Sequence, residues 1–325
     1  MPLKDQVLAY LVGRHGEPVS GQAMAAKLGV SRTAVWKAVK SLREDGCVIE
    51  GGTNRGYSLS QAGDILSAEA VRSALPEELR NISSVVYLPK TDSTNNEAKR
   101  RLAAPDGPEI IGAGGLFVFT DCQTAGRGRL GRSFASPVGG LYMTYVFNTS
   151  SPLAKAVSIT SAAAVAVAES LEDVGISDAG IKWVNDVYID GRKVCGILTE
   201  AVTGLDSGEK RSIIVGIGIN CSGSLPGELS DIAAGIGNVD RNALAADIMS
   251  RLYRYSSEID DRTWMAGYRR RSLMPGRDIW YFGRSGEKIS ARALYIDDSG
   301  ALVVRRDDTG EEVILSTGEV SVRIK

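Results

Sequence analysis

The spacing of apolar residues changes twice along this chain of 325 residues, and no other feature limits the fold as strongly. Up to Ser60 the apolar residues recur at helical spacing. After Pro275 they lie in short strand-like runs separated by turns, and the stretch between contains both patterns. The sequence therefore predicts an α+β protein with domains over residues 1–62, 67–273 and 274–325.

The first domain is predicted to be a winged helix-turn-helix. Its three apolar stripes indicate three helices, and Gly29 would end the second of them. Ser31 is placed to cap the third helix. Two strand-like runs between Val48 and Leu59, separated by a glycine-rich turn, indicate a hairpin that would form the wing.

The third helix carries polar and basic residues that suit DNA. The segment through Ser60 has eight basic and five acidic residues, whereas the whole chain has a formal net charge of -1, so a nucleic-acid surface must be local. Such a helix can reach base edges while the wing meets phosphates. Small basic units also serve as protein-docking modules, and this alternative stays open. The candidate DNA-binding residues are Ser31, Arg32, Thr33, Trp36, Lys37, Lys40 and Arg55.

The second domain is expected to combine a sheet with helices, and the third to be a small β-barrel. Strand-like runs cover Leu116–Phe119, Leu141–Phe147 and Ile213–Ile219, and an alanine-rich helix is expected over Ala156–Val174. The barrel is predicted from five short runs split by turns that contain glycine. These runs are Asp278–Phe282, Lys288–Ile296, Ala301–Arg306, Glu312–Leu315 and Val320–Ile324.

Cysteine usage and the start of the chain bear on the compartment. Cys47, Cys122, Cys195 and Cys221 form no C-x-x-C pair, which favours reduced thiols. The first residues show no basic-then-apolar signal pattern, and no stretch approaches the roughly 18 apolar residues of a membrane span. We therefore expect a soluble cytoplasmic protein without a membrane partner.

A loop of glycines and arginines is the first candidate site. Gly126–Gly131 matches the G-x-G-x-x-G pattern of dinucleotide-binding proteins, but no helix pattern follows it. The next strand, through Phe147, also lacks the acidic residue that would meet a ribose. Arg127, Arg129 and Arg132 can instead wrap an anion such as a triphosphate or an acyl phosphate. We expect this loop to become ordered when a ligand binds, although a solvated basic turn is the alternative.

A hairpin with two lysines is the second candidate site. The Asp190–Gly191 pair indicates a tight turn between two apolar strands. Strand alternation would put Lys182 and Asp186 on one face, with Lys193 near the turn. Lysines beside an arginine loop would offset the repulsion between a carboxylate and ATP, which any reaction that joins them requires.

These elements stand in the order and spacing of a known family. The polar cluster Thr91–Asn95 is interpreted by itself as a helix cap. The chain resembles the bacterial bifunctional biotin ligase/repressors in Asp92–Asn95 of this cluster, Gln123, the glycine-arginine loop, Lys182–Asp186, Lys193 with Gly196, and Gly216–Asn220. The resemblance covers the full chain and implies a winged helix-turn-helix, a central mixed sheet similar to class II synthetases, and an SH3-like C-terminal β-barrel.

The resemblance also assigns roles residue by residue. Arg127, Arg129 and Lys193 would contact the biotin carboxylate and the reacting phosphates, which makes them the catalytic candidates. The residues that would hold biotin are Ser93, Thr94, Asn95, Gln123, Arg127, Gly128, Arg129, Lys193 and Gly196. The residues that would hold ATP are Arg129, Arg132, Phe134, Lys182, Asn185, Asp186 and Asn220. No metal-ligating residue is implied.

The activity implied by this resemblance is that of a biotin–protein ligase that is also a repressor. Biotin and ATP, with Mg²⁺, would form biotinyl-5'-AMP, and biotin would pass to a lysine of a biotin carboxyl carrier protein. Biotinyl-5'-AMP would also act as the corepressor, promoting a homodimer that binds operator DNA. The alternatives are a biotin-sensing transcription factor without ligase activity, a lipoate or octanoate ligase or transferase, and a nicotinamide oxidoreductase.

Overall fold

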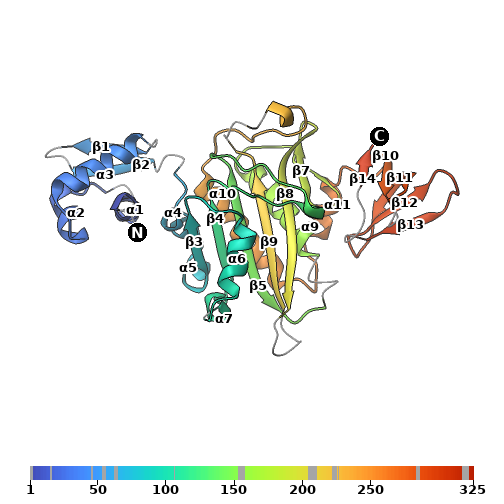
Figure 1. Cartoon of the computed structure of the whole chain (residues 1–325), viewed down its shortest axis with the longest axis horizontal. Coiled ribbons are helices and arrows are strands. Elements are labelled where there is room, and N and C mark those ends of the chain that lie inside the picture. The colour runs from blue at the N-terminus through green and yellow to red at the C-terminus, as the bar shows by residue number, and fades with distance from the viewer. Residues whose placement is uncertain are drawn as a thin grey trace.

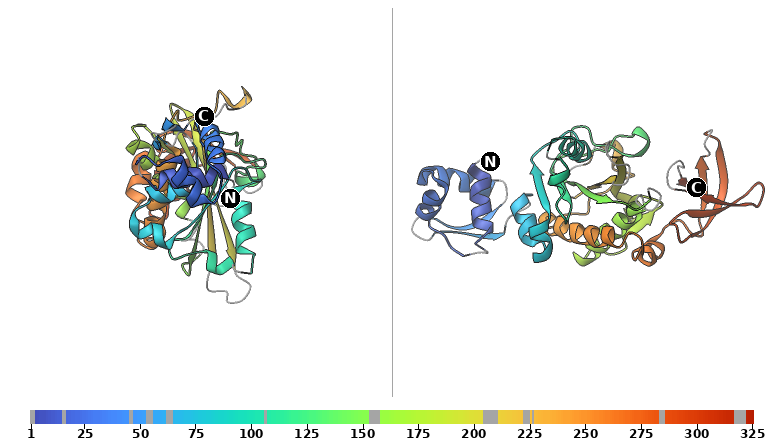
Figure 2. Two further views of the ribbon diagram at one scale, coloured as in Figure 1. Left: turned by 90° about the vertical axis from the view of Figure 1, so that its left-hand side faces the viewer. Right: turned by 90° about the horizontal axis from the view of Figure 1, so that it is seen from below.

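Three units lie in a row along the long axis of the molecule (Figure 1). A helical head is at one end, a large sheet with helices lies in the middle, and a small sheet is at the other end (Figures 1 and 2). The computed structural model describes residues 3–14, 17–44, 47–52, 56–61, 65–105, 107–152, 158–203, 211–221, 225, 227–282, 286–316 and 322–325.

The head has the predicted three helices and hairpin. Gly29, with a φ of 66°, ends the second helix. Ser31 Oγ accepts a hydrogen bond from the backbone N–H of Ala34 at 3.1 Å, so it caps the third helix as predicted. The wing residue Arg55 lies outside the described residues. The elements are α1 (Leu3–Val12), α2 (Gly21–Leu28), α3 (Arg32–Glu44), β1 (Val48–Gly52) and β2 (Gly56–Gln61).

A seven-stranded sheet forms the middle of the molecule. The strand order is β3-β4-β5-β9-β8-β7-β6; β3 and β4 pair in parallel, and the other described pairs are antiparallel. The three strands predicted from apolar runs are β4, β5 and β9. The bounds are β3 (Ser84–Leu88), β4 (Leu116–Thr120), β5 (Leu141–Thr149), β6 (Gly180–Lys182), β7 (Asp186–Ile189), β8 (Arg192–Thr203) and β9 (Arg211–Ile219).

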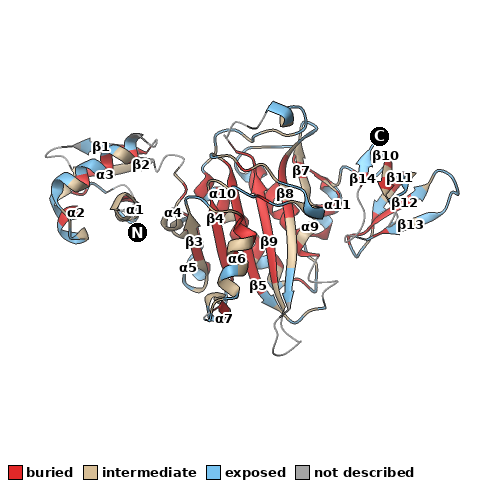
Figure 3. Cartoon of the chain, viewed as in Figure 1, coloured by how far each residue is buried: buried red, intermediate tan, exposed pale blue. Residues whose placement is uncertain are grey.

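Helices cover the two faces of this sheet unequally. On one face α4, α9, α10 and α11 share a large apolar core with the strands, which are buried along most of their length (Figure 3). The other face carries α6, packed over β4, β5 and β9. None of the helices in the described part could cross a membrane. The bounds are α4 (Ala68–Ala74), α5 (Glu77–Ile82), α6 (Thr94–Leu102), α7 (Gly107–Ile110), α9 (Ile159–Asp173), α10 (Arg241–Ser257) and α11 (Met265–Arg271).

The expected continuous strand over Lys182–Asp186 is wrong, because a turn separates β6 from β7. Trp183 in this turn is buried, and its Nε1 donates a hydrogen bond to the carbonyl of Gly300 in the small sheet at 3.0 Å. Lys182 and Asp186 still share a face, because they lie opposite each other in the antiparallel pair. The turn at Asp190–Gly191 is where the sequence predicts it.

The small C-terminal sheet has five antiparallel strands in the order β13-β12-β11-β10-β14. Within the described residues β13 and β14 are its two outer strands, so the sheet is open and the predicted barrel is not confirmed. The strands are β10 (Asp278–Phe282), β11 (Lys288–Ile296), β12 (Leu302–Arg306), β13 (Glu312–Leu315) and β14 (Val322–Ile324).

The head has an apolar core of its own, whereas the two sheets share one continuous core. The four cysteines are free, and three of them are buried. Leu42 is fully buried in the head, and Leu244 of α10 is fully buried in the large core. The head should therefore unfold as a separate unit.

Leu42→Ala tests this separation. Removing a buried leucine side chain destabilises its own core by about 2–5 kcal/mol. We expect differential scanning calorimetry to show a lower melting temperature for the head transition and an unchanged transition for the large core. Leu244→Ala, the matched control, should do the reverse. If both variants shift one common transition equally, the two cores are not independent.

Candidate functional site

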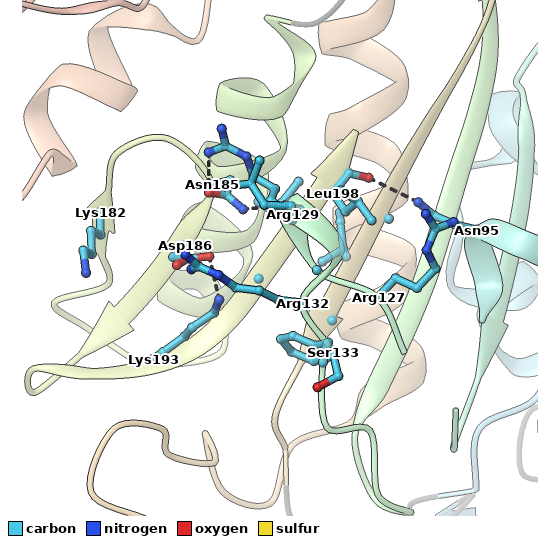
Figure 4. A pocket seen from close by; sticks show the side chains of 18 of the residues that line it. Asn95, Arg127, Arg129, Arg132, Ser133, Lys182, Asn185, Asp186, Lys193 and Leu198 are labelled. Carbon is cyan, nitrogen blue, oxygen red and sulfur yellow. Dashed lines mark hydrogen bonds and ion pairs between the residues drawn. The ribbon is translucent and has the colours of Figure 1, made fainter. Parts of the chain in front are cut away.

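A cavity of about 310 Å³ lies on the α6 side of the large sheet. Its walls come from the start of α6, the glycine-arginine loop, the β6–β7 turn, β8, β9 and the end of the chain (Figure 4). Both candidate sites, the loop and the lysine hairpin, border this one space. The fold thus brings together most of the residues that the sequence nominated.

Glycines make the floor of the cavity. Alternate residues of β9 face opposite sides of the sheet, so Ile217 enters the core while Gly216 and Gly218 face the cavity. A Cβ on Gly218 would lie 2.5 Å from the Phe134 ring, and one on Gly216 would lie 2.3 Å from Asn95 Oδ1. The missing side chains therefore create the space that these two residues occupy.

The start of α6 and Gln123 form the uncharged end of the cavity. Gln123 Oε1 accepts a hydrogen bond from the backbone N–H of Thr94 at 2.9 Å, and its Nε2 donates to Ser136 Oγ at 2.8 Å. Ser93 occupies the cap position of α6, as predicted, but its side chain makes no capping hydrogen bond. Gln123 supplies the capping oxygen instead, which leaves the Ser93 hydroxyl on the cavity wall.

Both the oxygen and the nitrogen of the Asn95 side-chain amide form hydrogen bonds within the protein. Its Oδ1 accepts from Thr144 Oγ1 at 2.7 Å, and its Nδ2 donates to Glu200 at 2.9 Å and to the carbonyl of Leu198 at 3.3 Å. Both donor hydrogens of the amide are therefore used within the fold. The structure favours Asn95 as a residue that fixes α6 against the sheet beside the cavity.

The opposite end of the cavity is strongly cationic. Among the described residues that line the whole cavity, six are basic and Asp186 alone is acidic, and all of the six except Arg127 lie at this end. Burial lowers the pKa of Lys182, and the neighbouring Lys193 adds to this shift. Positive groups gathered around one carboxylate favour a ligand with several negative charges. The basic residues are Arg127, Arg129, Arg132, Lys182, Lys193 and Arg323.

Lys193 and Arg129 lie at the centre of this cationic end. Lys193 Nζ is 2.7 Å from Asp186 Oδ1 and 5.7 Å from the centre of the Phe134 ring. Arg129 Nη1 donates to Asn185 Oδ1 at 3.3 Å, and Asn185 is itself fixed because its Nδ2 donates to the carbonyl of Ile197 at 2.7 Å. The loop and the hairpin are thus joined by contacts between predicted site residues.

Arg127 points to the other end of the cavity (Figure 4). Its Nη1 donates to Asn96 Oδ1 at 3.1 Å and lies 3.5 Å from Glu200 Oε1. Glu200 also pairs with Lys99 of α6 at 2.7 Å. The three loop arginines therefore diverge, and Arg127 lies with α6 rather than with Lys193. Glu200 was not predicted from the sequence, because it is distant from the loop along the chain and belongs to no motif.

Backbone hydrogen bonds form within the glycine-arginine loop. The N–H of Gly128 donates to the carbonyl of Arg132 at 2.7 Å, and the N–H of Phe134 donates to the carbonyl of Gly126 at 2.9 Å. At the tip Leu130 has a φ of 55° and is largely exposed. Only a short 3-10 turn forms here before β5, so this loop does not open an α-helix as a dinucleotide fingerprint does.

Two residues of the cavity wall come from the C-terminal sheet. Val322 and Arg323 of β14 line the cavity, although they are far from the other lining residues along the chain. Neither was predicted from the sequence. Asn220, which was predicted as an ATP-binding residue, is buried beside the cavity, where its Nδ2 donates to the carbonyl of Lys193 at 3.4 Å and its Oδ1 has no hydrogen-bond partner among the described residues.

The head presents a second surface, on α3. Arg32, Thr33, Lys37 and Lys40 are exposed, and Trp36 is 52% exposed with Lys40 Nζ 5.9 Å from its ring centre. The described residues nominated for DNA thus form one helix face together with the capping Ser31. Arg43 was not predicted from the sequence; its Nη2 donates to the carbonyls of Ile49 at 2.6 Å and Gly51 at 2.8 Å and so fixes the wing to α3.

Comparisons with known proteins agree with this geometry. Residues 91–220 match the model of the Biotin/lipoate A/B protein ligase family, and residues 4–58 match that of an HTH domain. The chain is 34% identical to the bifunctional ligase/repressor BirA of Bacillus subtilis over 94% of this chain and 95% of that protein. It is 33% identical to BirA of Escherichia coli, over 82% of this chain and 80% of that protein. This chain belongs to the family of bifunctional ligase/repressors.

The solved structures agree with this membership. The fold is similar to that of the biotin protein ligase from Aquifex aeolicus in complex with biotin and ATP, with a TM-score of 0.61 and 25% identity over 74% of this chain and 99% of that chain. The ligase family match spans every described residue of the cavity wall except Val322 and Arg323. The family resemblance predicted from the sequence is therefore confirmed.

Gly218→Ala tests the glycine floor. The added Cβ would lie 2.5 Å from the Phe134 ring, so the ring must move into the cavity. We expect the affinity for ATP, measured by isothermal titration calorimetry, to fall about tenfold, or about 1.4 kcal/mol. Gly227→Ala is the control, because a Cβ there meets no atom within 4 Å. Equal ATP affinity for the Gly218 variant and the parent would rule out this floor as part of the nucleotide site.

Proposed function

We propose that this chain joins biotin to AMP and then transfers biotin to a lysine of a biotin carboxyl carrier protein, and that it also represses transcription. The observation that carries the ligase activity is the cavity itself. One end offers hydroxyl and amide groups together with Arg127, and the other offers five basic side chains against one carboxylate. A carboxylic acid with a polar ring and a nucleoside triphosphate complement these two ends.

In the first step a biotin carboxylate oxygen attacks the α-phosphorus of ATP. A new P–O bond forms, the bond from the α-phosphorus to the bridging oxygen breaks, and pyrophosphate leaves. Lys193 and Arg129 offset the repulsion between the two anionic reactants and stabilise the charge that develops on the phosphate oxygens. No enzyme nucleophile is needed. The uncharged end, with Ser93, Thr94 and Gln123, would orient the biotin ring.

In the second step the amine of the carrier lysine attacks the acyl carbon of biotinyl-5'-AMP. An amide bond forms, the bond from the acyl carbon to the phosphate oxygen breaks, and AMP leaves while the amine loses a proton. Phe134 lies over the glycine floor, so we expect it to stack on the adenine. The unpartnered buried Oδ1 of Asn220 supports its assignment to the nucleotide side, because an adenine amino group can donate to it.

Mg²⁺ enters this proposal as part of the ATP substrate. The described residues contain no cluster of three or more potential metal ligands. Asp186, the single carboxylate of the described cavity wall, is already paired with Lys193. Phosphate oxygens and water are ordinary Mg²⁺ ligands, and an ion bound to ATP needs few protein ligands.

Lys193→Ala tests the ligase proposal. Loss of a positive group at the reacting phosphates should lower biotin-dependent ATP–pyrophosphate exchange by about 100-fold or more. Arg192→Ala is the control, because Arg192 is the adjacent, exposed cation of the same turn and is absent from the cavity wall. We expect near-normal exchange for the control. The same result for Lys193→Ala would overturn the assigned role.

Repression would combine the head with the ligase. The face of α3 would enter the major groove, with Arg32, Thr33 and Lys37 toward DNA and the wing on the backbone. Biotinyl-5'-AMP would promote a homodimer that reads two half-sites, since a helix-turn-helix usually binds DNA as a dimer.

The proposal also includes the three domain boundaries, the likeness of the central sheet to class II synthetases, and an SH3-like closure of the C-terminal sheet.

Lys37→Ala tests the DNA face. We expect weaker binding to random-sequence duplex DNA and a salt dependence, plotted as log Kd against log salt, that is shallower by about 0.9 because one phosphate contact is lost. Lys288→Ala, in the C-terminal sheet, removes an exposed charge far from the head and should leave the slope unchanged. An unchanged slope for Lys37→Ala would remove this residue from the DNA interface.

A lipoate or octanoate ligase is the rival within the same fold. The matched family model includes both biotin and lipoate ligases. We therefore propose biotin as the acid substrate because the relatives that match nearly the full chain are ligase/repressors. An exchange assay with biotin, lipoate and octanoate in competition decides between them. We expect the protein to prefer biotin; a preference for lipoate or octanoate would show that acid to be the substrate instead.

A further inference from the structure

The first two residues of α10 contact two distant parts of the molecule. Arg241 and Asn242 are both buried, with relative exposures of 4% each. The preceding Asp240 caps the helix, because its carboxylate accepts from the backbone N–H groups of Asn242 at 2.9 Å and Ala243 at 3.0 Å. The helix then packs against α9, α4 and β5. These two side chains are therefore held on a rigid support.

Arg241 holds both ends of the segment that carries the glycine-arginine loop. Its Nη1 donates to Asp121 Oδ1 at 2.7 Å and to the carbonyl of Gly140 at 2.7 Å. Asp121 directly follows β4 and Gly140 directly precedes β5. The segment between them contains Gln123 and the whole glycine-arginine loop. An arginine that is nearly excluded from solvent needs both partners, so it clamps the base of this segment firmly.

Asn242 holds the connection to the head. Its Nδ2 donates to the carbonyl of Ile65 at 2.9 Å, and its Oδ1 accepts from the backbone N–H of Ser67 at 3.0 Å. Between these two hydrogen bonds the chain passes from one core to the other. Ile65 packs against the core of the head, whereas Leu66 is 1% exposed within the large core. One amide therefore fixes the peptide that joins the two cores.

We propose that Arg241 and Asn242 are positioning residues that couple the ligand cavity to the DNA-binding head. Ligand contacts with the segment from Asp121 to Gly140 would fix its base through Arg241. The adjacent Asn242, on the same turn of helix, would then fix the peptide at Ile65 and Ser67 and with it the orientation of the head. The coupling needs no contact between ligand and head. It rests on the proposed function, because it assumes that biotin and ATP bind in the cavity.

Hydrogen exchange of the full chain, with and without biotin and Mg-ATP, tests this coupling. In the parent protein we expect ligands to slow amide exchange both in residues 122–139 and in residues 65–75. The effect on the second segment should be about fivefold or more, the lower end of typical coupling between sites. In Asn242→Ala the ligands should still slow exchange in residues 122–139, but the slowing in residues 65–75 should be lost.

A conservative variant and a control variant distinguish a loss of coupling from a general loss of stability. Asn242→Asp, when ionised, keeps an acceptor for the Ser67 N–H but cannot donate to the Ile65 carbonyl, so it should lose most of the ligand response in residues 65–75. Circular dichroism checks its folding, because burial of the carboxylate costs stability. Asn148→Ala is the matched control, since Asn148 accepts a hydrogen bond from Ser212 Oγ and touches neither segment. It should respond as the parent does.

The possible failures are distinguishable. If ligands slow exchange in residues 122–139 of every variant and the response in residues 65–75 is the same in Asn242→Ala, Asn242→Asp and the parent, the coupling role is overturned while the ligase proposal stands. If ligands leave residues 122–139 of the parent unprotected, the proposed ligand site fails, and the coupling fails with it.

Discussion

The gathering of like charges in one cavity is the constraint on which the rest of the structure depends. Cations repel one another, and burial strengthens this repulsion, so they stay together only if the scaffold holds them and nearby acceptors offset part of the cost. Asp186 lies against Lys193, and Asn185 accepts from Arg129. A ligand that carries several phosphates would relieve most of what remains.

The architecture follows from this need. The basic residues come from the glycine-arginine loop, from strands β6 and β8 of the large sheet and from β14, and each of these elements lines the same cavity. The hydrogen bond from Trp183 to Gly300 and the continuous core keep the C-terminal sheet against the large one, which brings Arg323 to the cavity. The head, with its separate core, is attached through a short peptide that Asn242 fixes.

Much of this could be predicted from the sequence, because several site residues are neighbours in it. The glycine-arginine loop and the hairpin around Asp190–Gly191 carry their chemistry within a few positions, and the helix stop at Gly29 is a local signal. Other features depend on distant contacts. Arg323 reaches the cavity only because the C-terminal sheet docks beside it, and Arg127 turns toward α6 because Glu200 lies there. No local pattern in the sequence predicts either contact. The turn at Trp183 is also not predicted locally, because it forms where the Trp183 side chain meets the C-terminal sheet.

A crystal structure with biotin and a non-hydrolysable ATP analogue tests the central claim most directly. We predict that the carboxylate of biotin and the α-phosphate lie side by side above the glycine floor, within hydrogen-bond distance of Lys193 and Arg129. The ring of biotin should contact the Ser93 and Gln123 end. A structure in which either ligand binds outside this cavity, or in which the phosphates contact neither cation, would contradict the account.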